Sequence, residues 1–247
     1  FVVVLLLLLQ VRQHLLQHLE GAVVAGVPRR QGVGAKGEDV GVLRLRRFLA
    51  DDLVLVLISG GGSALTPAPA PPITLAEKQA LTRLMLRAGA TINELNAVRK
   101  HCSLLKGGQL ARAAAPARVH SLLLSDVIGD PLDVIASGPT APDESTYDEA
   151  LAILVRFGIA DQVAPSIRRR LEQGRRGEIP ETPKPGDPLF ARVTNTVIGN
   201  NHLVIEAALR RARALGFAPH LVTRTLEGEA RELAGRFVSM ARDVRAG

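Results

Sequence analysis

The sequence predicts an α/β fold with a mainly parallel sheet and helices on both faces, a Rossmann-like three-layer sandwich. Two observations predict this fold: apolar runs bounded by glycine or polar residues, and helical segments that open with capping motifs. The two kinds of segment alternate along the chain, as they do in parallel sheets. Parallel strands read as continuous apolar runs because helices cover them. Ligands of such sheets bind beyond the carboxyl ends of the strands.

The first half of the predicted domain begins with a buried strand. A proline-rich loop follows it, and two capping boxes, Thr74 with Glu77 and Thr91 with Glu94, then open successive helices. The predicted elements are a strand over Leu53–Ile58, a helix from Thr74 to near Gly89, a helix from Thr91 to about Cys102, and a short helix over Gln109–Ala115.

The second half repeats the alternation. Its predicted elements are strands at Val119–Ser125, Val193–Ile198 and Pro219–Thr223, and helices at Tyr147–Phe157, Pro165–Gln173, Asn201–Leu215 and Glu229–Arg242. Glycines such as Gly158 and Gly216 follow two of the helices, as helix ends prefer. The segment Gly174–Asp187 is rich in Gly, Pro and charge, which indicates a surface connection or linker. These signals assign residues 51–242 to one α/β domain, whereas residues 1–50 form a divergent segment without a clear pattern.

Composition limits the classes of function. The chain has 247 residues, a hydrophobic fraction of 47% and an aromatic fraction of only 3%, with no Trp. Scarce aromatics argue against nucleic-acid modules that stack bases. The apolar run Phe1–Leu9 is shorter than the roughly 20 residues of a membrane helix. We therefore expect no nucleic-acid or membrane partner, and a cytoplasmic location.

The charges and the single cysteine point to a small anionic ligand rather than a metal cage. The net charge is +7, carried mostly by dispersed Arg, and a few Lys and Arg in a cleft suffice for an anionic substrate. Cys102 is the only cysteine, so the sequence excludes an internal disulfide and a Cys-based zinc site. The sequence leaves the oligomeric state open.

A glycine turn, Ser59-Gly60-Gly61-Gly62-Ser63, follows the first strand. Consecutive glycines let backbone N–H groups approach an anion, and the two hydroxyls add donors. The turn lacks the G-K-[ST] ending of a Walker A loop, the third glycine of a dinucleotide fingerprint and the last glycine of a nucleophile elbow. It is an anion cradle or, in the simpler interpretation, a tight exit from the strand.

Two further clusters carry charge. Asn96–His101 followed by Lys106-Gly107-Gly108 gathers cations that could clamp phosphate or carboxylate, or simply stabilise a helix C-terminus. Ser125–Asp130, followed by Ile135–Thr140, places two carboxylates after a strand. Such carboxylates suit Mg²⁺, which binds one or two of them together with phosphates, or they serve turn chemistry.

These clusters, in this order, resemble the class II glycerate kinases, the glycerate 2-kinase family also labelled hydroxypyruvate reductase. The resemblance covers about Asp51 to Arg242. The matching stretches are Leu57–Leu65, Asn96–His101, Lys106–Ala111, Ser125–Val127 with Ile135–Thr140, and more weakly Thr182–Asp187 and Glu227–Glu232.

The resemblance implies ATP-dependent, Mg²⁺-assisted phosphorylation of D-glycerate, with 2-phosphoglycerate as the favoured product. It implies catalytic roles for Arg99, Lys100 and Asp126, and Mg²⁺ ligation by Asp126 and Asp130. The implied nucleotide-binding residues are Ser59, Gly60, Gly61, Gly62, Ser63, Lys106, Ser137 and Gly138.

The chain also departs from the family. Members are longer at the C-terminus, so we expect their second domain to be largely missing and turnover by this chain alone to be low. The family's functional N-terminal Lys has only a faint counterpart at Lys36, to which we assign no role. Two alternatives stay open: an NAD(P)-dependent hydroxypyruvate reductase, which would need the absent dinucleotide fingerprint, and a non-catalytic kinase remnant.

Overall fold

A computed structural model describes residues 2–7, 48–226, 228 and 230–246 of the chain. It divides into two compact units, Phe1–Asn200 and Asn201–Gly247. Residues 8–47, which hold Lys36 and most of the uninterpreted N-terminal segment, lie outside the described residues. No helix within the described ranges is long and apolar enough to cross a membrane.

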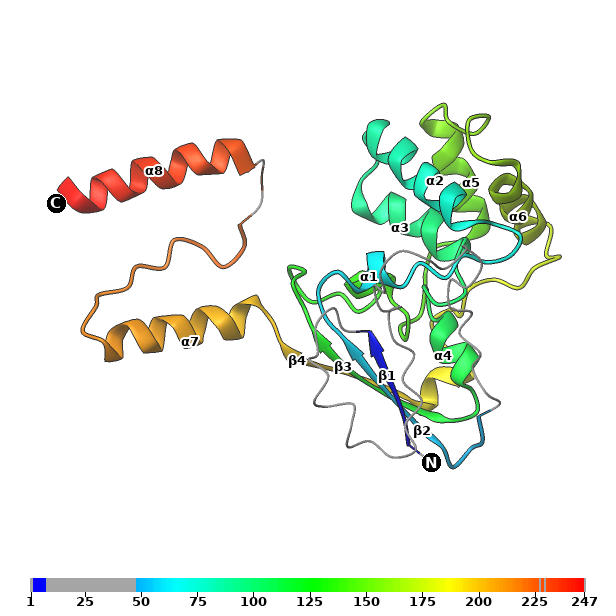
Figure 1. Ribbon diagram of the computed structural model, residues 1–247, viewed down its shortest axis with the longest axis horizontal. Coiled ribbons are helices and arrows are strands. Elements are labelled where there is room, and N and C mark those ends of the chain that lie inside the picture. Colours follow the sequence, from blue (N-terminus) through cyan, green and yellow to red (C-terminus); the bar gives the residue numbers. More distant parts are fainter. Residues whose placement is uncertain (1, 8–47, 227, 229, 247) are drawn as a thin grey trace, which may run out of the picture. The chain divides into compact units, whose positions relative to one another are not determined.

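The first unit contains a sheet of four parallel strands that lie in chain order (Figure 1): β1 (Val2–Leu7), β2 (Leu53–Ile58), β3 (Arg118–Leu124) and β4 (Val193–Gly199). Each strand pairs in parallel with the next. The α/β fold and the three strands predicted for this unit are confirmed. The sequence did not predict β1, because an apolar run so near the end of a chain has no flanking signals that distinguish a strand from other apolar segments.

One face of the sheet is buried. Val54, Val56 and Ile58 of β2 alternate with half-buried neighbours, and the face continues into Val119 and Leu123 of β3. Helix α4 (Gln109–Ala114) contributes apolar side chains to the same core. Side chains on the opposite face of β2 are half-exposed in the described residues, so the predicted second helical layer stays a prediction.

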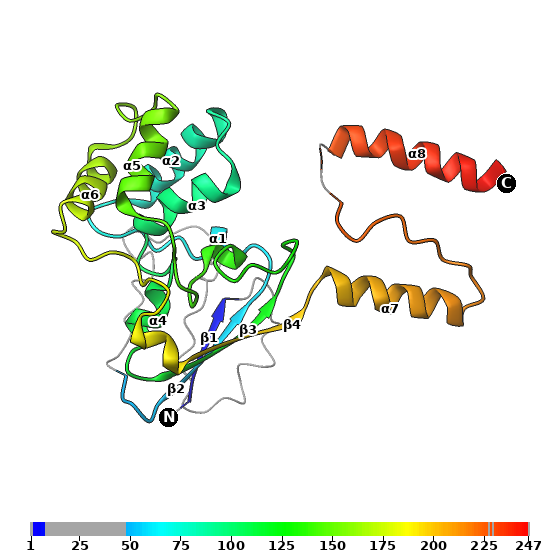
Figure 2. The same ribbon diagram turned by 180° about the vertical axis from the view of Figure 1, so that it is seen from behind.

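Four helices pack on one another rather than on the sheet: α2 (Leu75–Arg87), α3 (Ile92–His101), α5 (Tyr147–Arg156) and α6 (Pro165–Arg175). They surround a second apolar core and gather past the short helix α1 (Gly62–Leu65), beyond the carboxyl ends of the strands (Figures 1 and 2). Both predicted capping boxes, at Thr74 and Thr91, are present. The helical cluster therefore lies at the edge of the sheet where a ligand is expected.

The segment Gly174–Asp187 is more than the predicted surface connection. Gly174 still belongs to α6 and is buried, and Thr182 is 1% exposed. The prediction was wrong for these residues because Gly and Pro content reports backbone conformation and not burial. The segment leads into the short 3₁₀ helix η3 (Pro188–Arg192) before β4.

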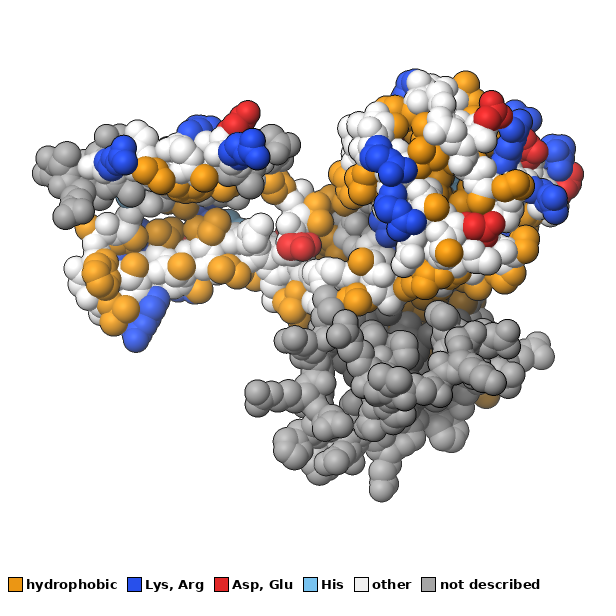
Figure 3. All heavy atoms as spheres, turned by 45° about the horizontal axis from the view of Figure 1, so that its top comes forward, with side chains coloured by type: hydrophobic (Ala, Val, Ile, Leu, Met, Phe, Trp, Pro, Cys, Tyr) orange, Lys and Arg blue, Asp and Glu red, His pale blue; other side chains and the backbone are white. Residues whose placement is uncertain are grey.

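The second unit consists of α7 (Asn201–Ala214), α8 (Ala230–Ala246) and the chain between them. The strand predicted at Pro219–Thr223 is wrong, because these residues form no strand in the structure. The described part of this unit offers no strand to pair with them, and a strand needs such a neighbour for its backbone hydrogen bonds. Apolar side chains line the surfaces of both helices, as Figure 3 shows, among them the exposed Val204 and Phe237.

We predict that Gly174→Ala destabilises the first unit. A Cβ atom at Gly174 would lie 2.3 Å from Cγ of Tyr147, whose ring is buried between α6 and His101. Overpacking of this kind costs about 1–3 kcal/mol, which denaturant unfolding would measure. Gly235→Ala in α8 is the matched control, because nothing lies within 4 Å of that position. An unchanged unfolding midpoint for Gly174→Ala would contradict the prediction.

Candidate active site

The glycine turn Ser59–Ser63 leaves β2 and enters α1. Gly61 has a left-handed backbone with φ of 80°, and a Cβ on Gly62 would lie 3.2 Å from Cβ of Ala136. Gly60 and Gly61 are exposed, and their amides have no hydrogen-bond partner among the described residues. Exposed amides without an acceptor make the turn able to bind an anion.

Asp126 lies directly beside this turn. A Cβ atom on Gly60 would be 2.9 Å from Oδ2 of Asp126, so only glycine fits there without a shift. The two residues meet because β2 and β3 are neighbours and each strand ends at the same edge. The glycine turn and the Asp126 turn therefore share one edge of the sheet. An anion on the turn would need a cation to offset the nearby Asp126 carboxylate.

A chain of hydrogen bonds, in which each donor and acceptor can be assigned, holds the glycine turn at Ser63. Lys106 Nζ donates to the carbonyl oxygen of Ser63 at 2.8 Å and to its Oγ at 2.9 Å. Ser137 Oγ donates to Oδ1 of Asn96 at 3.0 Å, so its only hydroxyl proton is used. Ser63 therefore donates to Ser137 across the 2.9 Å between their hydroxyls. The chain ties together residues from four separate segments.

Residues 136–138 carry backbone strain next to that chain. Ala136, Ser137 and Gly138 have φ values of 52°, 64° and 60°, which is unfavourable for the first two. The amides of Gly107 and Gly108 donate to the carbonyls of Ser137 and Gly138 at 2.9 and 2.7 Å. Since such strain persists only where surroundings enforce it, and it clusters at functional sites, the predicted site residues Ser137 and Gly138 form a tightly held loop.

Three basic side chains contact the turn or the residues that follow it and have no carboxylate partner among the described residues: Lys106, Arg99 and Lys78. Lys106 is 0% exposed. Burial lowers its pKa well below the usual value, and the charges of Arg99 and Lys78 lower it further. Arg99 Nη2 donates to the Ser63 carbonyl at 3.3 Å, while its buried Nε has no partner. Lys106 therefore holds its proton less firmly than an exposed lysine, and an anion at the turn would favour its charged form.

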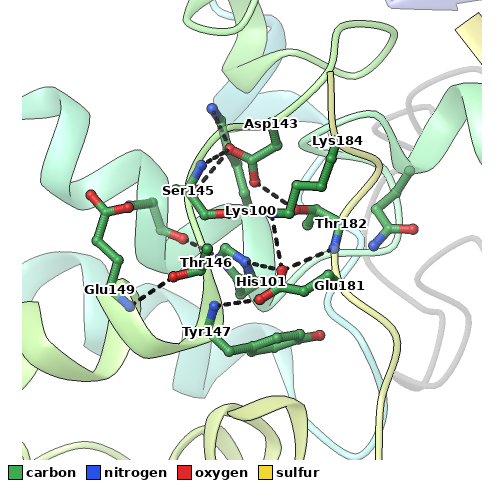
Figure 4. Close-up of polar contacts among 12 residues, drawn as sticks. Lys100, His101, Asp143, Ser145, Thr146, Tyr147, Glu149, Glu181, Thr182 and Lys184 are labelled. Carbon is green, nitrogen blue, oxygen red and sulfur yellow. Dashed lines mark hydrogen bonds and ion pairs between the residues drawn. The ribbon is translucent and has the colours of Figure 1, made fainter. Parts of the chain in front are cut away.

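Lys100 belongs to a different cluster. Its Nζ lies 3.1 Å from Oδ1 of the fully buried Asp143 and 3.5 Å from Oδ2 of the half-exposed Asp133. Asp143 also accepts hydrogen bonds from Thr182 and Ser145 (Figure 4). Two carboxylates thus compensate the charge of Lys100, in contrast to that of Lys106.

His101 anchors the rest of this second cluster. Its Nδ1 donates to the Ala97 carbonyl at 2.7 Å, and its Nε2 lies 3.1 Å from Oε2 of Glu181. Burial alone would raise the pKa of Glu181, but hydrogen bonds from His101 and from the Tyr147 amide outweigh it and hold the pKa at about 2. The ionised carboxylate therefore fixes the segment around residue 181 against α3 (Figure 4).

The predicted metal ligands are only partly brought together. Asp126 is exposed beside the turn, whereas Oδ2 of Asp130 accepts a hydrogen bond from Asn200 at 2.6 Å. Within the part of the chain that the structure describes, no three His, Cys, Asp or Glu side chains gather as a metal site. Mg²⁺ needs only one or two carboxylates when phosphates supply further oxygens. The donor set therefore fits Mg²⁺ bound together with a phosphorylated ligand.

Sequence reasoning missed several residues of the site region: Lys78, Asp133, Asp143, Glu181 and Thr182. Lys78 had a usable signal, because it shares the core-facing stripe of α2 with Leu81 and Met85. A lysine is rarely fully buried at such a position unless its charge is paired. The others have no local pattern, since their partners are 33 to 80 residues away in the chain.

Comparison with known proteins identifies the family. A family model described as a domain of unknown function, DUF4147, matches residues 10–172. The glycerate kinase of Rattus norvegicus is 46% identical over 200 residues, which are 81% of this chain and 37% of the relative. The D-glycerate 2-kinase of Thermotoga maritima is 44% identical over 196 residues, which are 79% of this chain and 44% of the relative.

A solved structure agrees with these relatives. The crystal structure of a glycerate kinase from Thermotoga maritima matches with a TM-score of 0.63 and 44% identity, over 76% of this chain and 42% of that one. The chain thus spans about two fifths of the length of the relatives it matches. The glycine turn, the cation-bearing α3 and the Asp126 loop all lie inside the matched region. The chain therefore belongs to the glycerate kinase family, to whose DUF4147 region it corresponds.

Proposed function

We propose that this chain provides the nucleotide- and glycerate-binding part of an ATP-dependent kinase that converts D-glycerate to 2-phosphoglycerate. One observation carries the proposal: the exposed amides of Gly60 and Gly61 have no hydrogen-bond partner among the described residues, and they belong to the turn whose last residue, Ser63, accepts hydrogen bonds from Lys106 and Arg99. Gly60 also lies beside the Asp126 carboxylate. The family supports it, since a relative is named D-glycerate 2-kinase.

This arrangement suits phosphoryl transfer, which depends on positioning and on neutralising charge. The amides of the turn hold phosphate oxygens, and Ser59 and Ser63 border them. Arg99 and Lys106 donate to the Ser63 carbonyl at the end of the turn, and from there they stabilise the negative charge of a phosphate bound to the turn. Asp126 and Asp130 would hold Mg²⁺, which would supply further charge neutralisation when bound. Asp126 is also the exposed carboxylate that can orient the glycerate hydroxyl.

Lys100 takes part from the position of α3 that follows Arg99. Its ammonium is fixed by Asp143, and its second partner, Asp133, has a side chain that is 50% exposed. Displacement of Asp133 by the glycerate carboxylate would let Lys100 bind the substrate while Asp143 keeps it in position. In this proposal Lys100 is catalytic and Asp143 is a positioning residue.

The first test measures substrate binding and phosphate transfer together. We expect the chain to bind ATP–Mg²⁺ and D-glycerate in calorimetric titrations, and any phosphorylated product to be 2-phosphoglycerate by ³¹P NMR. Binding is measured separately because the chain spans only part of its relatives. Absence of binding for both substrates would contradict the proposal, as would NADH oxidation in the presence of hydroxypyruvate.

Ser63→Ala tests the support of the turn. The variant removes an acceptor of Lys106 and the donor to Ser137. We expect ATP to bind about tenfold more weakly, which corresponds to about 1.4 kcal/mol, because the turn loses its link to Ser137. Ser166→Ala is the control, since Ser166 also uses its hydroxyl in a hydrogen bond, but to Glu77 of α2. Equal ATP affinities of the two variants would argue against the role of Ser63.

Asp143→Ala tests the position of Lys100. It leaves a buried ammonium with one partner, which costs about 3–5 kcal/mol of unfolding free energy. The double variant Lys100→Met, Asp143→Leu should recover most of that stability, because both charges leave the interior together. It should not recover glycerate binding. If Lys100→Met alone bound and phosphorylated glycerate normally, the catalytic role of Lys100 would be wrong.

A further inference from the structure

Lys78 is a charged residue in an apolar position that none of the motifs explains. It lies on the inner stripe of α2 with Leu81 and Met85 and is 3% exposed. Its Nζ donates to the carbonyl oxygen of Pro67 at 2.6 Å, and no ion pair joins it to any carboxylate in the described residues. Burying a charged lysine without a carboxylate partner is unfavourable.

Lys78 and Lys106 make the same kind of contact, a hydrogen bond from the side-chain nitrogen to a backbone carbonyl oxygen. Lys106 donates to the carbonyl of Ser63, and Lys78 donates to the carbonyl of Pro67. These two carbonyls lie at either end of the short stretch that leaves the glycine turn. The amino groups of two buried lysines therefore hold both ends of the segment Ser63–Pro67, and Arg99 contacts its first residue as well.

We propose that Lys78 is a further residue of the anion-binding machinery, which positions the glycine turn through its hydrogen bond to Pro67 and whose charge favours an anion in that turn. This inference depends on one part of the proposed function, namely that the glycine turn binds an anion. Lys78 is a positioning residue, because it touches the segment behind the turn rather than the ligand.

The electrostatic surroundings of Lys78 make its proton sensitive to charge at the turn. The groups that face it are Arg99 of α3, Arg170 of α6, Lys106 and the buried thiol of Cys102. Burial lowers the pKa of Lys78 to about 7, with Cys102 opposing and Arg99 and Arg170 adding to the shift. Around neutral pH the side chain is therefore partly deprotonated, and a nearby anion favours the charged form.

The direction of the pH dependence follows from this. The protonated fraction of Lys78 falls as the pH rises through 7, so an anion should bind more tightly at pH 6 than at pH 8.5. A rise of one unit in the Lys78 pKa on binding corresponds to up to about a tenfold change in affinity over that range. Binding near pH 7.5 should take up protons from the buffer.

Sulfate is the appropriate probe, because it is a divalent anion that does not itself titrate between pH 6 and pH 8.5. Its dissociation constant is obtained from the increase in unfolding free energy with sulfate concentration, at constant ionic strength made up with chloride. For the wild-type chain we expect the constant to rise severalfold between pH 6 and pH 8.5.

Two substitutions at Lys78 test whether its charge and its hydrogen bond to Pro67 determine the pH dependence of sulfate binding. Lys78→Arg keeps a permanent charge and a donor for Pro67, so sulfate affinity should stay at the tight level across the pH range. Lys78→Met removes both, so affinity should be weak and independent of pH. Lys184→Met is the control, because Lys184 bonds Thr182 and pairs with Glu181 in the other cluster, and it should keep the wild-type profile.

The outcomes distinguish this inference from the proposed kinase. If Lys78→Arg keeps the wild-type pH profile, or if wild-type sulfate affinity does not vary with pH, the inference is wrong. Should Lys78→Met fail to fold, the Lys78→Arg profile decides alone. Sulfate binding with the expected profile but no binding of ATP or D-glycerate would overturn the kinase and leave the role of Lys78 intact.

Discussion

The buried side chain of Lys106 is the constraint on which the site depends. It is fully enclosed, has no carboxylate partner among the described residues, and donates its hydrogen bonds to Ser63. A buried amino group is unfavourable unless hydrogen bonds satisfy it, so the surrounding structure must fix it. The hydroxyls of Ser63 and Ser137 and the amide of Asn96 do so, and they thereby join the glycine turn to the strained loop and to α3.

Two neighbouring clusters use the cations of α3 and of the turn that follows it in opposite ways. Lys100 is neutralised by Asp143 and Asp133, whereas Arg99 and Lys106 are left uncompensated. A compensated lysine stabilises the fold and holds a position, while uncompensated cations lower the free energy of an incoming anion. Residues almost adjacent in sequence therefore have different physical roles, because a helix directs neighbouring side chains to different faces.

The fold places these clusters where strands end and helices gather. Parallel pairing of β2 with β3 brings Gly60 next to Asp126, so closely that a Cβ atom on Gly60 would require the Asp126 carboxylate to shift. The helices α2, α3, α5 and α6 have their own apolar core. Helices α2 and α3 supply Lys78 and Arg99, and the turn after α3 supplies Lys106. Backbone amides, carboxylate and buried cations thus converge at one edge of the sheet, as open α/β sheets generally arrange ligand sites.

The sequence by itself determined the local elements: the strand Leu53–Ile58, the capping boxes at Thr74 and Thr91, and the glycine turn, all of which depend on residues close in the chain. It also determined the family, through motifs kept in order. Only the tertiary structure decided that Lys106 lies beneath Ser63, that Asp143 holds Lys100, and that Pro219–Thr223 forms no strand. Those outcomes depend on partners distant in sequence, and neither periodicity nor composition encodes which distant residues will meet.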